Sequence, residues 1–236
     1  MEKPFYEFDL ASESDLINEL ETLHSFCSDT SNYNKVILRG PEREGFNNTI
    51  REFDSFSTLS DEYNEIEKWI SENDFNIGQF SLYGKTIDWR DYPLIYKYIV
   101  SKVFEIYGND IIVRKLDDTK FSIKKFTLSE GLLTMYKKSG RLSPHKDGKP
   151  AIPKDFTKLA NILLYLNKDY KKRCGGCFVV NGKELPPDYG KLVFLNFRGD
   201  SDPEHSVSLL KCDVNRIALL FNITYMNAEK IIWNNE

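Results

Sequence analysis

Apolar residues recur at helical spacing in three separate segments before residue 110. The first segment follows capping residues at 12–15, the second begins at Ser60, and the third begins at Pro93, a residue that suits the first turn of a helix. Each segment gathers its apolar residues on one face, which predicts three amphipathic helices. These faces contain Leu16, Ile17, Leu20 and Leu23; then Ile66, Trp69 and Ile70; then Leu94, Ile95, Tyr98, Ile99, Val103, Phe104 and Tyr107.

The pattern changes at Ile111 to short apolar runs, mostly β-branched or aromatic, separated by Gly, Pro, Asp and Asn. Helices followed by strands indicate an α+β fold, and we predict a double-stranded β-helix (jelly roll) with the N-terminal helices packed on one sheet. The chain then divides into a helical and lid region, 1–110, integrated with a jelly-roll core, 111–236. The predicted strands lie near 111–115, 121–126, 131–137, 142–147, 158–167, 177–181, 190–196, 205–210 and 215–224.

Composition and charge narrow the class of protein. Hydrophobic residues make up 41% of the 236, which suits a globular domain with a sizeable core. No apolar run reaches the roughly 18 residues of a membrane span, and the N-terminus lacks the apolar stretch of a signal peptide, so a cytoplasmic location is expected. Residues 1–75 carry 18 acidic and 6 basic side chains, whereas the remainder carries 18 acidic and 26 basic. The basic part would attract a dianionic ligand, while the overall acidity disfavours nucleic-acid binding.

Four cysteines in a chain of this length do not suggest a disulfide framework. Cys174 and Cys177 form a C-x-x-C pair, a spacing also found in redox and zinc sites, but the chain has no second such pair. Cys27 and Cys212 are isolated in the sequence. We therefore expect Cys174 and Cys177 to be reduced thiols beside a strand, where Gly175-Gly176 would allow a close backbone approach.

Two of the three histidines lie in the most informative pattern of the chain, His145-x-Asp147 followed by His205 58 residues later. In a strand, residues i and i+2 point to the same side, so His145 and Asp147 can reach one ion together, while His205 must arrive from another strand. Two imidazoles and one carboxylate on one face of a metal leave the other positions open, as in non-haem Fe(II) oxygenases. The absence of cysteine from this set argues against a structural zinc site.

The segments around these residues resemble a known family. Their order is similar to that of the Fe(II)/2-oxoglutarate dioxygenases of the prolyl-hydroxylase type, and the stretch Tyr165–Asp169 is similar to a segment of the oxygen-sensing prolyl hydroxylases. The resemblance covers residues 130–225, and the interval from His205 to Arg216 is one or two residues longer than usual, which points to a bulge or longer turn at Lys211–Asp213. The segments are Tyr136–Gly140, His145–Asp147, Leu163–Asp169, Gly175-Gly176, Pro187–Phe194, Pro203–Val207 and Asn215–Leu219.

The resemblance implies an enzyme and assigns roles to its residues. The His-x-Asp and distant His set would hold Fe(II), and Arg216 would pair with the distal carboxylate of 2-oxoglutarate. Tyr136 and Tyr165 occupy positions where the family has tyrosines that hydrogen-bond this co-substrate. The implied reaction consumes O2, converts 2-oxoglutarate to succinate and CO2, and hydroxylates a C–H bond, with ascorbate as a candidate reductant. Asp147 fills the ligand position that halogenating relatives leave free for chloride, so hydroxylation is favoured.

The substrate implied by the resemblance is an amino-acid side chain, with a prolyl residue or a free amino acid as the first candidate. Free amino acids and polypeptides both stay open as substrates. The stretch 39–57, which reads as a long loop, and the turn Gly148–Pro153 would cover the substrate. We expect Lys149, with Lys138 and Arg141, to face an acidic or carboxylate-bearing substrate.

Two other functions stay open at this point. A nucleic-acid demethylase of the same superfamily would typically have another arginine six residues after the co-substrate arginine, where this chain has Asn222. A cupin-like binding module without turnover is disfavoured by the intact metal set together with Arg216. Co-substrate turnover measured without any other substrate separates the enzyme from the binding module.

Overall fold

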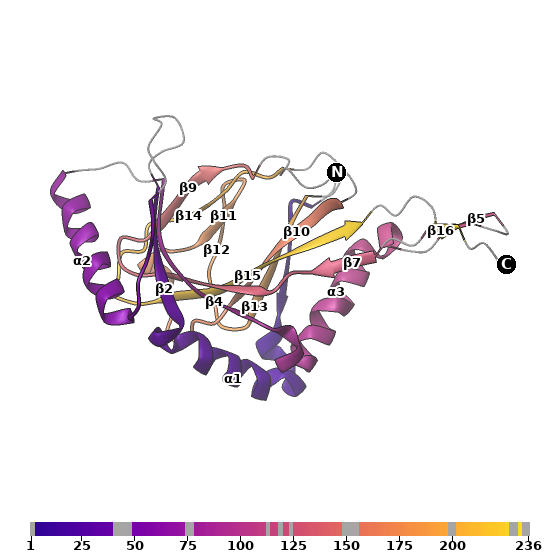
Figure 1. The fold of residues 1–236 in the computed structure, drawn as a ribbon, viewed down its shortest axis with the longest axis horizontal. Helices are drawn as coiled ribbons and strands as arrows, with labels where there is room; N and C mark the ends of the chain where they lie inside the picture. Colours follow the sequence, from indigo (N-terminus) through magenta and orange to yellow (C-terminus); the bar gives the residue numbers. More distant parts are fainter. Residues whose placement is uncertain are drawn as a thin grey trace.

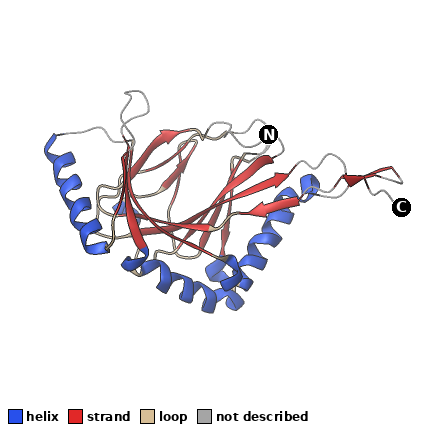
Figure 2. Cartoon of the chain, viewed as in Figure 1, coloured by secondary structure: helices blue, strands red, loops and turns tan. Residues whose placement is uncertain are grey.

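The computed structural model describes residues 3–39, 49–73, 78–111, 114–117, 120–122, 125–147, 156–197, 202–226 and 231–232. A strongly curled sheet forms its centre, and long helices lie at the sides of the sheet and below it (Figure 1 and Figure 2). The predicted α+β fold with a jelly roll is confirmed. None of the helices in these ranges combines the length and the apolar character needed to cross a membrane.

The three predicted helices are present as α1 (Ile17–Ser28), α2 (Phe56–Asn73) and α3 (Pro93–Ile111). The Glu19 carboxylate on α1 caps α3 by accepting from the backbone N–H of Leu94 at 3.0 Å and of Ile95 at 2.9 Å. This contact satisfies donors that the first turn of a helix leaves unpaired and places negative charge at the positive end of the helix. Short 3-10 helices are η1 (Leu10–Ser12), η2 (Ser14–Leu16), η3 (Thr30–Asn32), η4 (Trp89–Asp91) and η5 (Lys172–Cys174).

Among the described residues, thirteen strands form one sheet, with the order β1-β13-β10-β15-β8-β4-β9-β14-β11-β12 and with β2, β3 and β7 attached beside this path. A small sheet of β16, β6 and β5 lies apart from it, near the C-terminus (Figure 1). The bounds are β1 (Phe5–Asp9), β2 (Tyr33–Arg39), β3 (Thr49–Glu52), β4 (Gln79–Ile87), β5 (Arg114–Asp117), β6 (Lys120–Ser122), β7 (Lys125–Leu128), β8 (Gly131–Tyr136), β9 (Arg141–His145), β10 (Phe156–Tyr165), β11 (Phe178–Val180), β12 (Lys183–Leu185), β13 (Lys191–Asn196), β14 (His205–Val207), β15 (Arg216–Met226) and β16 (Ile231–Ile232).

The expectation that helices come first and strands afterwards is wrong for the N-terminal region, because β1 to β4 also lie there. β1 pairs along β13, β2 pairs with β3 and β4, and β4 pairs with both β8 and β9. β3 and the start of α2 occupy part of the long loop predicted at 39–57, while residues 40–48 lie outside the described ranges. The region 1–110 therefore supplies strands to the same sheet as residues 111–236.

Successive side chains along β10, β13 and β15 alternate between two hydrophobic cores. The outer core lies beneath the helices and contains Phe194 and Leu219 together with Leu20 of α1. The inner core contains Val193 and Leu195, and several of its members, Leu195 among them, line the cavity described below. This alternation turns polar side chains of the same strands toward the interior of the jelly roll, where the candidate site is found.

Cys174 and Cys212 form a disulfide, so the expectation that Cys174 is a reduced thiol is wrong. The two residues are 38 positions apart, but the segments before β11 and before β15 lie side by side, and Lys211 N–H donates to the Cys174 carbonyl at 2.7 Å. Spacing in the sequence gives no sign of this contact between distant segments. Cys177 keeps a free, buried thiol, as expected.

Candidate functional site

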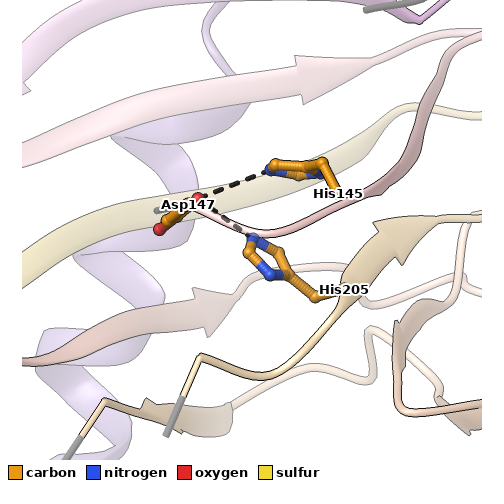
Figure 3. Close-up of side chains that lie close together, drawn as sticks. All are labelled: His145, Asp147 and His205. Atoms are coloured by element: carbon orange, nitrogen blue, oxygen red, sulfur yellow. Dashed lines mark ion pairs between the residues drawn. The ribbon is translucent and has the colours of Figure 1, made fainter. Parts of the chain in front are cut away.

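His145, Asp147 and His205 come together where β9 and β14 meet. β9 ends at His145, β14 begins at His205, and the two histidines lie opposite each other in this antiparallel pair. Asp147 follows β9, and its Oδ1 lies 3.5 Å from Nε2 of His145 and 3.4 Å from Nε2 of His205. The three side chains point toward one another (Figure 3), and one ligand atom of each lies within 4.8 Å of the others. The residues that the sequence pattern selected thus form one group.

Both imidazoles are oriented by the same kind of backbone contact. Nδ1 of His145 lies 3.0 Å from the carbonyl oxygen of Ser143, and Nδ1 of His205 lies 3.0 Å from the carbonyl oxygen of Pro203. A carbonyl oxygen only accepts hydrogen bonds, so each Nδ1 carries the hydrogen. In the neutral ring, Nε2 then presents its lone pair toward Asp147, which is the form of histidine that binds a metal ion.

The carboxyl of Asp147 is ionised. Burial raises its pKa, but the Lys158 ammonium, which donates a hydrogen bond to Oδ2 and brings positive charge beside it, opposes burial, and the pKa lies below its ordinary value. Two nitrogen lone pairs and a carboxylate oxygen that face one another repel unless a cation lies among them. The donor set therefore fits a divalent metal ion, and its nitrogen and oxygen ligands suit iron better than a structural zinc ion.

Arg216 begins β15 and is 2% exposed. Its Nε donates to the carbonyl oxygen of Gly176 at 2.6 Å, and an Nη donates to the hydroxyl of Tyr165 at 3.2 Å. Its guanidinium carbon lies 4.9 Å from the centre of the Tyr136 ring. Within the described ranges no carboxylate pairs with Arg216. An anion bound in the cavity that Arg216 lines would therefore stabilise its buried positive charge.

The two tyrosines of the predicted co-substrate site differ in their access. Tyr136 lines the cavity, whereas Tyr165 is fully buried, contacts Arg216 and does not line the cavity. Burial raises the pKa of both hydroxyls, that of Tyr165 to about 12. Both tyrosines therefore stay protonated near neutral pH, and the Tyr165 hydroxyl accepts from Arg216 while keeping its own hydrogen to donate.

One cavity of about 1080 Å³ contains both the His-Asp-His group and Arg216. Part of its wall is apolar, and more of its ionisable side chains are basic than acidic, which suits an anionic ligand. The apolar wall includes Leu142, Leu163, Phe178, Leu195, Val207 and Leu220. The cations are Arg39, Lys146, Lys158 and Arg216, and the acids are Asp147 and Glu204.

Lys138 and Arg141 do not line this cavity, contrary to expectation. Nζ of Lys138 lies 3.8 Å from a carboxylate oxygen of Glu67 on α2, because the turn after β8 faces that helix. Lys149 and the turn Gly148–Pro153, which we expect to cover the substrate, lie outside the described residues.

Sequence reasoning missed two groups of polar residues at the cavity. On β4, Nε2 of Gln79 donates to Ser81 Oγ at 3.0 Å and to Tyr83 Oη at 3.2 Å. On β10, Lys158 and Asn161 both line the cavity. The alternation of polar and apolar residues at 79–83 is a signal that could have identified the first group. The spacing of Lys158 and Asn161 predicts opposite faces of a strand, so it gives no such signal.

No family model matches the chain, and no curated protein sequence matches it. Solved structures do share its fold. A prolyl-4-hydroxylase from Pseudomonas putida aligns over 96% of this chain and 93% of its own, with a TM-score of 0.51 and 13% identity. A truncated viral collagen prolyl hydroxylase from Paramecium bursaria Chlorella virus-1 aligns over 94% and 90%, with a TM-score of 0.51 and 14% identity. A 2OG-Fe(II) oxygenase family oxidoreductase from Burkholderia pseudomallei aligns over 98% and 89%, with a TM-score of 0.50 and 10% identity. The chain therefore has the fold of the 2OG-Fe(II) oxygenases.

Proposed function

We propose that this chain is an Fe(II)- and 2-oxoglutarate-dependent dioxygenase that hydroxylates an amino-acid side chain and releases succinate and CO2. The observation that carries the proposal is that one cavity contains both a His-Asp-His donor set and a buried arginine with no acidic partner in the described ranges. A metal site alone, or a buried arginine alone, would fit many proteins. Together they suit a metal ion and a dicarboxylate that bind side by side.

The iron would be held by Nε2 of His145, Nε2 of His205 and Oδ1 of Asp147. The hydrogen on each Nδ1 fixes the tautomer, so both rings can offer Nε2 to the ion without rearrangement. One negative charge and two neutral ligands leave a ferrous ion with net positive charge, which favours an anionic co-substrate at its open positions.

The co-substrate would place its distal carboxylate against Arg216. Gly176 and Tyr165 hold one edge of the guanidinium, and its remaining N–H groups are available to pair with a carboxylate. Tyr136 stacks beside the guanidinium and would close the pocket on the other side. Binding of a carboxylate would neutralise a positive charge that is otherwise buried among neutral groups.

Iron and 2-oxoglutarate together would supply the oxidising chemistry, in which O2 and 2-oxoglutarate become succinate, CO2 and a hydroxyl group on the substrate. The chain binds and orients these groups and excludes water from them. Leu163, Phe178 and Leu195 form an apolar part of the wall that suits this last role. Ascorbate is the proposed external reductant.

The proposed substrate is an amino-acid side chain, with a prolyl residue or a free amino acid first. Two of the solved structures that share the fold are described as prolyl hydroxylases. Arg39 and Lys146 in the cavity wall suit a substrate with a carboxylate near the target carbon. Asn222 lies in the same wall where a demethylase would typically have an arginine, which favours an amino-acid over a nucleic-acid substrate.

The decisive experiment measures succinate formation by the purified chain with Fe(II), 2-oxoglutarate, ascorbate and O2. Peptides and free amino acids are then screened for a product that has gained the mass of one oxygen atom. We expect slow succinate formation without substrate and faster formation with the correct one. A hydroxylated nucleobase as the only product would overturn the substrate class.

The metal assignment is tested by His205→Ala and Asp147→Ala, which should abolish succinate formation and Fe(II) binding while leaving the fold near intact. His24→Gln is the matched control, because His24 lies on α1 and its Nδ1 contacts the Leu166 carbonyl, away from the cavity. If His205→Ala forms succinate at the wild-type rate, the proposed ligand set is wrong.

A further inference from the structure

The two oxygens of the Asp147 carboxylate have different neighbours. Oδ1 faces the Nε2 atoms of His145 and His205 (Figure 3). Oδ2 accepts one hydrogen bond from Nζ of Lys158 at 2.8 Å and another from Nδ2 of Asn161 at 2.6 Å. One oxygen therefore belongs to the proposed metal-ligand group, and the other is occupied by two donors from β10.

A bulge in β10 places Lys158 and Asn161 on the same face of the strand. In a regular strand, residues i and i+3 point to opposite faces. Lys158 and Ala160 lie opposite consecutive residues of β15, so Leu159 is an extra residue in β10. The extra residue reverses the alternation, and both Lys158 and Asn161 line the cavity while Leu159 is buried in the outer core.

Lys158 is fixed within the site and does not lie free on the surface. Its side chain is 14% exposed, and its ammonium lies 4.4 Å from the centre of the Phe197 ring. The backbone N–H of Phe197 donates to the Leu159 carbonyl at 2.9 Å, which anchors the bulge. Asp147 is the carboxylate that pairs with this ammonium, and charge-assisted hydrogen bonds of this kind are stronger and better defined than neutral ones.

Asn161 acts as a donor in this arrangement. With its amide reversed, the amide oxygen would face the carboxylate oxygen at the same short distance, and two acceptors would repel each other. In the observed orientation its Oδ1 is buried and has no hydrogen-bond partner within the described ranges. Leaving a buried acceptor unpaired costs free energy. Because Oδ1 makes no contact in the described part of the chain that would hold the amide, the hydrogen bond from Nδ2 to Asp147 is the contact that fixes this side chain.

We infer that Lys158 and Asn161 are positioning residues that restrict Asp147 to a single metal-facing oxygen. The inference rests on the proposed function, because it concerns the iron that the His-Asp-His group would hold. A carboxylate can bind a metal ion through one oxygen or through both. With two donors on Oδ2, the oxygen that stays available to the ion is Oδ1.

This restriction decides how many positions of the ion stay open. Two histidines and one carboxylate oxygen leave one face of the ion for 2-oxoglutarate, which binds through two atoms, and for O2. A second oxygen from Asp147 would compete for the position that is left to O2. Lys158 and Asn161 therefore control access of O2, whereas 2-oxoglutarate binding depends on Arg216.

The test uses the full chain loaded with Fe(II) and 2-oxoglutarate in the absence of oxygen, with nitric oxide as a probe of the open position. Asn161→Leu keeps the size of the side chain and removes the donor, and Lys158→Met keeps the stem over Phe197 and removes the ammonium. The dissociation constant of nitric oxide, followed by absorption and electron paramagnetic resonance, should rise by about ten-fold in each variant and further in the double variant, which is the lower end of the effect that residues orienting metal ligands have on metal affinity or activity. The dissociation constant of 2-oxoglutarate should stay at its wild-type value.

Lys168→Met is the matched control, because Lys168 also pairs with a carboxylate, that of Glu21, but does not line the cavity. It should bind nitric oxide as the wild type does. Lys158→Arg keeps a charged donor and should recover part of the affinity, which a general packing defect would not allow. Thermal denaturation shows which variants fold, and if Asn161→Leu does not, Asn161→Asp replaces the donor by a repelling carboxylate of similar size and should weaken nitric oxide binding in the same way.

Two results would overturn the inference, and they have different consequences. Wild-type affinity for nitric oxide in the folded double variant would refute the roles of Lys158 and Asn161 and leave the proposed function intact. Failure of the wild-type chain to bind Fe(II), or equally tight binding by Asp147→Ala, would refute both the inference and the proposed function.

Discussion

Arg216 is the residue on which the proposed co-substrate site depends. Its described partners, the Gly176 carbonyl and the Tyr165 hydroxyl, are neutral. Neutral partners satisfy individual N–H groups but do not neutralise a charge taken out of water. A guanidinium that is 2% exposed and lines a cavity is therefore stabilised most by an anion that enters the cavity.

Replacing Arg216 by alanine should weaken 2-oxoglutarate binding by about ten- to a hundred-fold, because a hydrogen bond to a charged group contributes roughly 1.5–3 kcal/mol. Arg216→Lys should weaken it less, since lysine keeps the charge and loses only the planar fork. Calorimetric titration of 2-oxoglutarate into Co(II)-loaded protein measures both values. The exposed Lys211 provides the control, since Lys211→Ala should bind normally. An unchanged dissociation constant in Arg216→Ala would assign the co-substrate to another cation.

For single residues of the site, the sequence predicts which side chains lie together when their positions follow from regular strand geometry. His145 and Asp147 could be grouped from their i, i+2 spacing, and His205 from its rarity in the chain. Lys158 and Asn161 could not be grouped, because their common face depends on one extra residue that only the pairing of β10 with β15 reveals. The spacing of residues in the sequence does not reveal a bulge, so side-chain contacts that depend on a bulge cannot be predicted from the sequence.

Among the elements, most strands after residue 111 were predictable because their apolar runs stand out between turn residues, whereas the short strands β12 and β16 and the N-terminal strands were missed. β4 shows the reason. Its Gln79 and Tyr83 line the cavity, while Phe80 and Leu82 are fully buried in the outer core. The polar and apolar alternation at 79–83 that could have revealed this strand is short, and it lies between two segments in which helical spacing dominates the sequence.

At the scale of elements, the clearest prediction concerns the disulfide between Cys174 and Cys212, which links the segment before β11 to the segment before β15. Its loss in Cys212→Ser, or its reduction, should lower the free energy of unfolding by about 2–4 kcal/mol, since the cross-link closes a 38-residue loop in the unfolded chain. It should also weaken 2-oxoglutarate binding, because Gly176, which holds Arg216, lies two residues after Cys174. Urea denaturation and co-substrate titration, each with and without reductant, measure the two effects.

Cys177→Ser is the matched control for this prediction, because Cys177 belongs to the same C-x-x-C pair and has a free thiol. That variant should respond to reductant as the wild type does, whereas Cys212→Ser should not respond. Identical unfolding of the wild type with and without reductant would contradict a stabilising role. The proposed cytoplasmic location bears on the same bond, since thiols there are kept reduced. Mass spectrometry of protein alkylated directly in cells would test the location and the cross-link together.

In the whole molecule, the N-terminal region and the C-terminal strands share one core. Leu20 of α1 and Ile95 of α3 are fully buried in the same cluster as Phe194 of β13 and Leu219 of β15. β1 covers the edge of β13, and β4 joins β8 to β9. The boundary that we predict near residue 110 therefore separates regions of different secondary structure, and we propose that it does not separate independently folding units.

Residues 111–236 produced alone should therefore fail to fold cooperatively. The fragment would expose the edge of β13 and the apolar outer face of the sheet, and it would lack the strand that links β8 to β9. The full chain should instead unfold in one transition. Urea titrations followed by near-ultraviolet circular dichroism compare the two, and residues 1–110 added in trans should restore part of the signal if the missing surface is the cause. A fragment that unfolds cooperatively by itself and binds Co(II) would contradict the shared core, because the His-Asp-His group would then need nothing from β1, β4 or the helices to keep its geometry.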